Sequence, residues 1–251
     1  MKHLVIANWK MNPVSTEDAI RLAKEEDMRD VIIAPPSFHM PSVRAVIKRG
    51  ALCAQDIDPI DALSGPYTGA ISPLLFKKMG VRYAIIGHSE RRAHLGETDD
   101  SIAKKVHTAL TAGIIPVLCV GETSEVRAGG YMNARDFVLR QIERDLDLVR
   151  GGVGKLIIAY EPVWAISTNN NDGGVIDDSE SAGEMIQNIK AFLAESMKLW
   201  AQYKIVGLYG GSVGVNNIGM FLKERSIDGF LVGGASLRAK EFKKIVEIIH
   251  S

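Results

Sequence analysis

A carboxylate follows one of the apolar runs of the sequence, in a position where it could move a proton. Glu161 comes directly after the apolar run Leu156–Tyr160 and precedes Pro162. A carboxylate at the end of a buried strand is partly desolvated, which raises its pKa towards that of a useful general base. A structural glutamate that holds a backbone amide or an arginine is an equally reasonable alternative.

A histidine occupies a similar position after another apolar run. His88 follows Tyr83–Gly87 and stands where a helix begins. The positive end of a helix disfavours an imidazolium, and a neutral imidazole can donate a hydrogen bond to a carbonyl oxygen. The alternative is a buried, hydrogen-bonded structural histidine. Glu90 and Arg91 follow at once, and both could equally be charges on the surface of that helix.

A lysine and an asparagine stand at the end of the first apolar run. Asn8 closes the run His3–Asn8, and Lys10 stands alone among apolar and amide residues. A solvated lysine is the common alternative, but the position at a strand end favours an electrostatic role. Nothing nearby argues for a lowered lysine pKa, so a Schiff-base lysine is not indicated.

Glycines follow the last two apolar runs. Gly210, Gly211 and Ser212 follow one run, and Gly233 and Gly234 follow the other. Exposed backbone amides in such turns, next to a short helix start, bind anions such as phosphate. Two tight turns without a ligand are the alternative for either pair alone.

Short apolar runs alternate with longer amphipathic stretches along the chain, and this order predicts the fold. Runs that are apolar throughout indicate parallel strands buried on both faces. They are His3–Asn8, Val31–Ala34, Ala51–Ala54, Tyr83–Gly87, Pro116–Val120, Leu156–Tyr160, Lys204–Tyr209 and Gly229–Val232. Helices are expected from Ser15 to about Asp27 and over Ser42–Lys48, Ser72–Met79, Thr98–Ala112, Val138–Val149, Ser179–Lys198, Val215–Glu224 and Ser236–His250.

Strict strand–helix alternation predicts an α/β protein with a (β/α)₈ barrel formed by one domain over residues 1–251. An open doubly wound sheet is the alternative, but it usually carries a G-x-G-x-x-G turn after its first strand. Here the first strand is followed by Trp9-Lys10-Met11-Asn12. Active sites of such barrels lie where the strands end, which is where the polar residues described above are found.

The composition excludes several classes of partner. Thirty acidic residues balance thirty basic ones, so nothing favours a nucleic acid or a membrane surface. No apolar run is long enough for a membrane span or a signal-peptide core. Cys53 and Cys119 both lie in apolar runs and are expected to be reduced, which predicts a cytoplasmic protein without a disulfide or metal site.

Taken together, these motifs resemble the triosephosphate isomerase family over essentially the whole chain. They are Asn8–Asn12, Ala54–Asp56, Tyr67–Gly69, Gly87–Arg92, Cys119–Glu122, Ala159–Ile166, Tyr209–Val213 and Asp228–Leu237. The resemblance implies an isomerase that interconverts dihydroxyacetone phosphate and D-glyceraldehyde 3-phosphate through an enediolate. It implies no metal and no organic cofactor.

The resemblance also implies a role for each site residue. Glu161 would be the base, and His88 would be the electrophile that polarises the carbonyl. Lys10 and Asn8 would bind substrate and offset its negative charge, and Glu90 would lie behind the site as part of the catalytic apparatus. Backbone amides would hold the phosphate at Ser167, Ser212, Gly233 and Gly234. Closing a lid would exclude water from the reaction, and the lid would consist of Pro162, Val163, Trp164, Ala165, Ile166, Ser167, Thr168 and Asn169.

Members of this family are dimers, so a homodimer is expected, with Thr68 at the interface near the partner's Lys and Asn. The departures from the family pattern include one in the lid and one at the subunit contact. The lid usually continues Ala-Ile-Gly-Thr-Gly-Lys, but here Ser167 and Asn169 replace both glycines. A positive φ at Ser167 in a closed lid would cost about 1–3 kcal/mol. The family's Thr-Gly-Glu also ends here in Ala70, which removes the carboxylate that would commonly pair with the Arg matching Arg91 at the subunit contact.

Rival functions make different demands on the residues. An aldolase would need a lysine emerging from the barrel, and a metal-dependent epimerase would need converging histidine and acidic ligands. A barrel that only binds a sugar phosphate, or serves as an assembly partner, would be expected to have lost Asn8, Lys10, His88 or Glu161, and all four are present.

Overall fold

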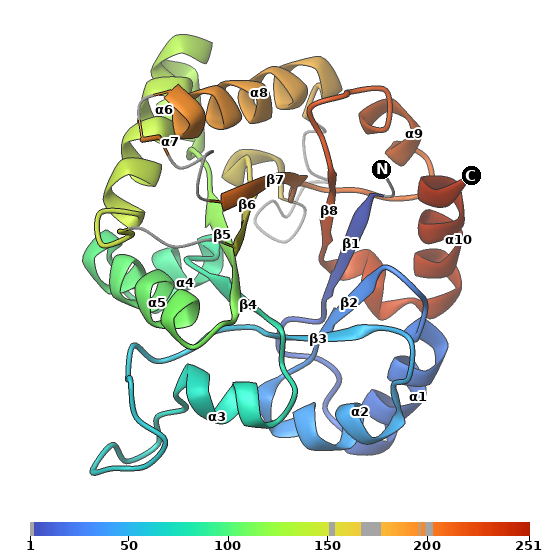
Figure 1. Cartoon of the computed structure of the whole chain (residues 1–251). Helices are drawn as coiled ribbons and strands as arrows, with labels where there is room; N and C mark the ends of the chain where they lie inside the picture. Colours follow the sequence, from blue (N-terminus) through green and yellow to red (C-terminus); the bar gives the residue numbers. More distant parts are fainter. Residues whose placement is uncertain (1–2, 151–153, 167–176, 196, 199–202) are drawn as a thin grey trace.

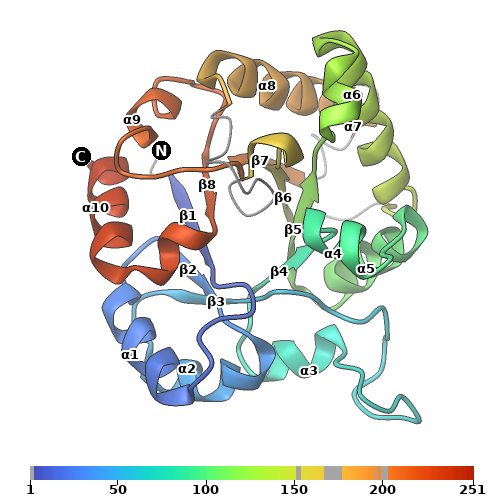
Figure 2. The ribbon, with the colours of Figure 1, turned by 180° about the vertical axis from the view of Figure 1, so that it is seen from behind.

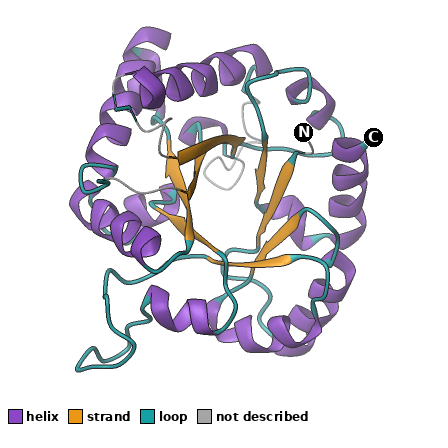
Figure 3. Ribbon diagram, viewed as in Figure 1, coloured by secondary structure: helices purple, strands orange, loops and turns teal. Residues whose placement is uncertain are grey.

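The computed structural model describes residues 3–150, 154–166, 177–195, 197–198 and 203–251. Among these residues, eight parallel strands close into a barrel in sequence order, with the first strand paired to the last. The barrel is drawn end-on in Figure 1, and Figure 3 shows the strands inside a ring of helices. The strands are β1 (Leu4–Asn8), β2 (Val31–Ala34), β3 (Ala51–Ala54), β4 (Tyr83–Ile86), β5 (Ile115–Val120), β6 (Gly154–Tyr160), β7 (Tyr203–Tyr209) and β8 (Gly229–Val232).

Helices follow the strands and cover the outside of the barrel, as the view from behind in Figure 2 also shows. The α-helices are α1 (Thr16–Glu26), α2 (Met40–Val46), α3 (Pro73–Lys78), α4 (Ser89–His94), α5 (Asp99–Thr111), α6 (Ser124–Ala128), α7 (Tyr131–Asp145), α8 (Ser179–Glu195), α9 (Ile218–Phe221) and α10 (Ala239–His250). In the described part of the chain, no helix is long and apolar enough to cross a membrane.

The core forms two layers because side chains alternate between the two faces of each strand. In β6, Ile157 and Ala159 face the barrel interior, where they pack with Ile6 of β1. Their neighbours Leu156 and Ile158 belong to the layer between the strands and the helices. Burial on both faces explains why the strand sequences are apolar throughout.

The predicted barrel is confirmed, and the strand positions are close to those expected. β6 and β7 begin earlier than predicted, at Gly154 and Tyr203, and β5 begins at Ile115. The expected helix Val215–Glu224 is wrong over most of its length, since only Ile218–Phe221 is α-helical. The backbone there instead turns at Gly214, whose N–H donates to Asn217 Oδ1 at 2.7 Å.

Further helix predictions need correction, among them α7, which spans Tyr131–Asp145 rather than Val138–Val149. α2 spans Met40–Val46 rather than Ser42–Lys48, because Pro41 fits the first helical turn, where its missing N–H costs nothing. Sequence analysis also left out α4 as a defined helix and α6 altogether. Both are short, and charged or polar residues make up much of each one.

A long loop connects β3 to α3 and projects away from the barrel (Figures 1 and 2). Its base is closed by Asp58, whose N–H donates to Ile71 O at 3.1 Å and whose carboxylate accepts from Ile71 N at 2.8 Å. Between Asp58 and Ile71 the loop carries exposed residues, including Tyr67 and Thr68.

Candidate active site

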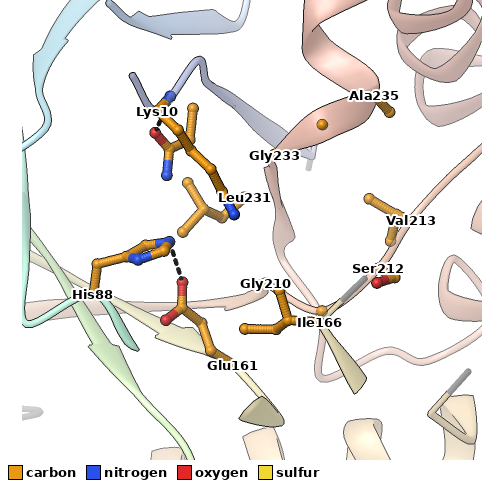
Figure 4. Close-up of a pocket in the computed structure, with 13 residues that line it drawn as sticks. Lys10, His88, Glu161, Ile166, Gly210, Ser212, Val213, Leu231, Gly233 and Ala235 are labelled. Atoms are coloured by element: carbon orange, nitrogen blue, oxygen red, sulfur yellow. Dashed lines mark hydrogen bonds and ion pairs between the residues drawn. The ribbon is translucent and has the colours of Figure 1, made fainter. Parts of the chain in front are cut away.

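A pocket opens at the carboxyl ends of the strands, and Figure 4 shows the side chains around it. It is lined by residues from β1, β4, β6, β7 and β8 or the loops that follow them. They are Asn8, Lys10, His88, Glu161, Ile166, Gly210, Gly211, Ser212, Val213, Leu231, Gly233, Gly234 and Ala235. The sequence-predicted residues Asn8, Lys10, His88, Glu161, Ser212, Gly233 and Gly234 are thus brought together.

Glu161 continues the inward-facing series of β6 after Ile157 and Ala159, so its side chain enters the mouth of the barrel. The residue is 1% exposed. Its backbone N–H donates to Val120 O at 2.7 Å, and its Oε2 accepts from Ser89 N at 3.0 Å. The backbone is held so closely that a Cβ on Gly121 would lie 1.7 Å from Glu161 O. Only glycine fits there.

His88 reaches the pocket because Gly87 adopts φ +71°, which ends the strand alternation of β4. His88 is the N-cap of α4, and its Nδ1 accepts from Glu90 N at 3.2 Å. A backbone amide can only donate, so this contact uses Nδ1 as the acceptor and favours the tautomer with the hydrogen on Nε2. That Nε2 lies 3.2 Å from Glu161 Oε1 (Figure 4).

Lys10 enters the pocket from the loop after β1 with a positive φ of 52°. Its backbone N–H donates to Asn8 Oδ1 at 3.1 Å, and its carbonyl accepts from Gln55 Nε2 at 2.7 Å. Its ammonium group contacts Glu90 Oε1. In Figure 4 the Lys10 side chain extends into the pocket from the same side as His88.

Glycines form the other side of the pocket. Gly233 follows β8 and precedes a short 3₁₀ turn, Gly234–Leu237, whose Ser236 hydroxyl donates to Gly233 O at 2.7 Å. A Cβ on Gly233 would lie 3.3 Å from Lys10 Cε, so glycine lets the lysine stem pass close to this backbone. Gly210 plays a similar part, since a Cβ there would lie 2.9 Å from Glu161 Cγ.

The first part of the predicted lid is described, and it lies against the pocket. Val163–Ala165 forms a single 3₁₀ turn after Pro162. Ile166 lines the pocket, and Ala165 O accepts from Ser212 Oγ at 2.7 Å. The predicted lid residues Ser167, Thr168 and Asn169, and the predicted phosphate contact at Ser167, lie outside the described residues.

Glu122 is a functional candidate that sequence analysis did not single out. It is 0% exposed and lies in the loop that follows β5, two residues after the strand ends. Its Oε1 accepts from Trp164 Nε1 at 2.9 Å and from Tyr160 Oη at 3.0 Å, and Arg127 Nη1 lies 3.5 Å away. The lid tryptophan is therefore tied to a buried carboxylate. The reasoning applied to Glu161, an acid after an apolar run, could have found Glu122 too.

Two predicted residues outside the lid also lie outside the pocket lining. Glu90 contacts the ammonium group of Lys10 without lining the pocket. Thr68 is exposed on the loop between β3 and α3. The loss of the expected carboxylate at Ala70 does not leave Arg91 unpaired, because its Nη2 lies 2.8 Å from Asp56 Oδ2 and its Nε lies 3.2 Å from Glu97 Oε1.

Cys119 lies beside Glu161 as a packing residue. Burial, together with the nearby Glu161 carboxylate, raises the pKa of the Cys119 thiol well above its usual value. A thiol held protonated in this way is a poor nucleophile. Within the described residues, no group of three or more His, Cys, Asp or Glu side chains is placed to hold a metal ion.

The fold and the site define a class of protein: a (β/α)₈-barrel enzyme whose mouth holds a buried carboxylate, an imidazole, a lysine and several glycines. Comparison with known proteins makes this specific. The sequence model of the triosephosphate isomerase family matches residues 3–249, and the chain belongs to that family.

Individual relatives agree over the full length of the chain. A triosephosphate isomerase from Clostridium botulinum is 39% identical, with 97% of this chain and 98% of the relative covered. Another from Dictyoglomus thermophilum is 36% identical, with 98% and 99% covered. The chain is therefore an isomerase that interconverts dihydroxyacetone phosphate and D-glyceraldehyde 3-phosphate.

Proposed function

We propose that Glu161 is the base and His88 the electrophile of this isomerisation. The observation that carries the proposal is their mutual geometry, with His88 Nε2 3.2 Å from Glu161 Oε1 at the edge of one pocket. A base and a hydrogen-bond donor so close together can act on adjacent atoms of one small substrate. Glu161 takes a proton from the carbon beside the carbonyl and returns it to the neighbouring carbon.

His88 acts as a neutral donor. Its Nε2–H donates to the substrate carbonyl oxygen and stabilises the negative charge that develops there as Glu161 removes the proton. The amide of Glu90 supports this role, because it occupies Nδ1 as a donor and so favours the tautomer with the hydrogen on Nε2. The same imidazole then helps to move protons between the two substrate oxygens.

Lys10 and Asn8 supply electrostatic stabilisation. Both line the pocket, and the Lys10 ammonium offsets negative charge on the phosphate and on the enediolate. Its contact with Glu90 holds the charge in place between turnovers. Asn8 is 5% exposed and its side chain also accepts from Lys10 N, so the two residues form one unit.

The phosphate group binds at the glycine-lined side of the pocket. Ser212, Gly233 and Gly234 line this side, where small residues leave the backbone accessible to an anion. Ser167 supplies a further amide when the lid lies over the site. The lid, Pro162–Asn169, excludes water with its apolar residues, and Ile166 already lines the pocket.

The active form is a homodimer that works in the cytoplasm on a small-molecule triose phosphate. An exposed apolar surface supports the dimer: Met11 is 90% exposed, Val14 is 95% exposed and Phe38 is 82% exposed. Exposed apolar patches of this kind mark interaction sites. The two segments are joined, since the ring of His39, next to Phe38, hydrogen-bonds Pro13 O at 2.9 Å. Thr68 lies on the projecting loop that would reach the partner.

A coupled assay with D-glyceraldehyde 3-phosphate tests the proposed function. The purified chain should produce dihydroxyacetone phosphate without added metal or cofactor. Cleavage to smaller fragments would indicate an aldolase, a change at one hydroxyl-bearing carbon would indicate an epimerase, and binding without turnover would indicate a non-catalytic barrel. Any of these three results would overturn the proposal.

A further inference from the structure

A tryptophan separates Asn8, the last residue of β1, from Lys10 in the loop that follows (the β1 loop). Its indole N–H is bound by a buried acid. Trp9 lies between Asn8 and Lys10 and is 0% exposed. Its Nε1–H donates to Glu26 Oε2 at 2.8 Å. Glu26 is the last residue of α1 and is also 0% exposed. The contact joins the catalytic loop to the end of the first outer helix.

The backbone of this loop is in a conformation that needs support. Lys10 has a φ of 52°, which a lysine adopts only where its surroundings determine it. Gln55 Nε2 donates to Lys10 O at 2.7 Å, and Trp9 N donates to Ala34 O at 3.2 Å. These bonds fix the main chain on one side. The Trp9 indole, anchored at Glu26, fixes the residue directly before Lys10 from the other side.

A buried glutamate is a costly choice for this position. The second oxygen, Glu26 Oε1, has no hydrogen-bond partner among the described residues. Burial raises the pKa of Glu26 to about 8, which favours the neutral acid over the carboxylate near pH 7. An apolar side chain would fill the space without this desolvation cost. What the carboxyl group adds is an acceptor for the indole N–H.

We propose that Glu26 is a positioning residue for the reaction, acting through its hydrogen bond to Trp9 to hold Asn8 and Lys10 in the pocket. This rests on the proposed function, in which Lys10 binds the substrate phosphate. Glu26 itself does not line the pocket. Loss of the anchor lets the loop relax, and small displacements of a charge that binds substrate are costly.

Steady-state kinetics of Glu26→Leu and Glu26→Gln test the proposal. The glutamine oxygen can accept the same hydrogen bond, so Glu26→Gln should keep KM within about twofold of the wild type. Glu26→Leu should raise KM, and the inhibition constant of inorganic phosphate, by about five- to tenfold, with a smaller change in kcat. In a Trp9→Phe background, the Leu substitution should add little, since the donor is already gone.

A matched control separates positioning from loss of stability. Val138→Ala removes buried volume in α7, away from the β1 loop, and should lower Tm without changing KM. If Glu26→Leu does not fold, Trp9→Phe replaces it, because it removes the same hydrogen bond. An unchanged KM in the folded variant, or equal KM shifts for Leu and Gln, overturns the inference. A wild type without isomerase activity would instead overturn the proposed function.

Discussion

The side chains of His88 and Glu161 lie within hydrogen-bonding distance of each other, with His88 Nε2 3.2 Å from Glu161 Oε1. Each is also held from behind by the start of α4: Glu90 N donates to His88 Nδ1, and Ser89 N donates to Glu161 Oε2. Two successive amides of one helix start therefore orient both groups. The arrangement favours the imidazole hydrogen on the side of the base, where the proposed function puts the substrate carbonyl.

His88→Gln tests the electrophile. The amide can donate a hydrogen bond but cannot exchange protons between the substrate oxygens, so we expect kcat to fall by about 10²- to 10⁴-fold. The measurement is the coupled assay at saturating substrate, with circular dichroism as a check on folding. A folded variant that retains turnover within tenfold of the wild type would contradict the assignment.

Trp164→Phe tests the anchoring of the lid. The change removes the indole donor to Glu122 but leaves the Tyr160 hydroxyl bonded to the same carboxylate. We expect a loss of about 1–2 kcal/mol in the free energy of unfolding and more phosphate released per isomerisation, since the enediolate is less well protected. Unfolding in urea and a phosphate-release assay measure the two effects. Tyr131→Phe, which removes a hydroxyl outside the lid, is a control that should leave phosphate release unchanged.

Buried Glu26 predicts a dependence of stability on pH. Its folded pKa of about 8 lies above the ordinary 4.5, so the native state holds a proton that the unfolded chain releases. Stability should therefore fall as pH rises between these values, by about 1.4 kcal/mol per pH unit from this group. Glu26→Gln should flatten the slope by that amount. Urea unfolding at pH 5.5 and pH 8 measures it, and identical slopes in both proteins would refute the prediction.

Val14→Asp tests the dimer surface. A charge in the centre of a buried apolar contact is strongly unfavourable, so we expect a monomer with greatly reduced turnover at assay concentrations. Sedimentation velocity reports the oligomeric state. Met132→Asp is the matched control, because this exposed methionine lies on α7, away from the β1 loop, and should leave the dimer intact. A wild type that is fully active as a monomer would remove the basis of this prediction.

The sequence allowed the barrel and the centre of the site to be predicted for one physical reason. Strands buried on both faces are apolar throughout, so each polar residue at a strand end, such as Glu161 or Lys10, is conspicuous. α6 could not be found in this way, because it is too short to show a helical period, and α4 was expected only as a helix start after His88. α9 was overestimated because the Gly214–Asn217 turn interrupts a helix-like pattern.

Sequence patterns could not predict the contacts between segments that are distant in the sequence. Glu26 stands in the acidic stretch Glu25-Glu26-Asp27 and reads as part of a solvated helix end, yet the fold buries it against Trp9. The pairing of Lys10 with Glu90 likewise depends on how β1 and α4 meet in space. Such pairs are set by tertiary packing, and local sequence carries no signal for them.

The role of Glu161 is the central claim, and Glu161→Gln tests it most directly. Glutamine is close in size and can still accept from Ser89 N, but it cannot take a proton from carbon. We predict that kcat falls by at least about 10³-fold and that exchange of the substrate's carbon-bound hydrogen with deuterated solvent is lost in parallel, in a folded protein that still binds inorganic phosphate. A folded Gln variant that retains more than a tenth of wild-type turnover would contradict it.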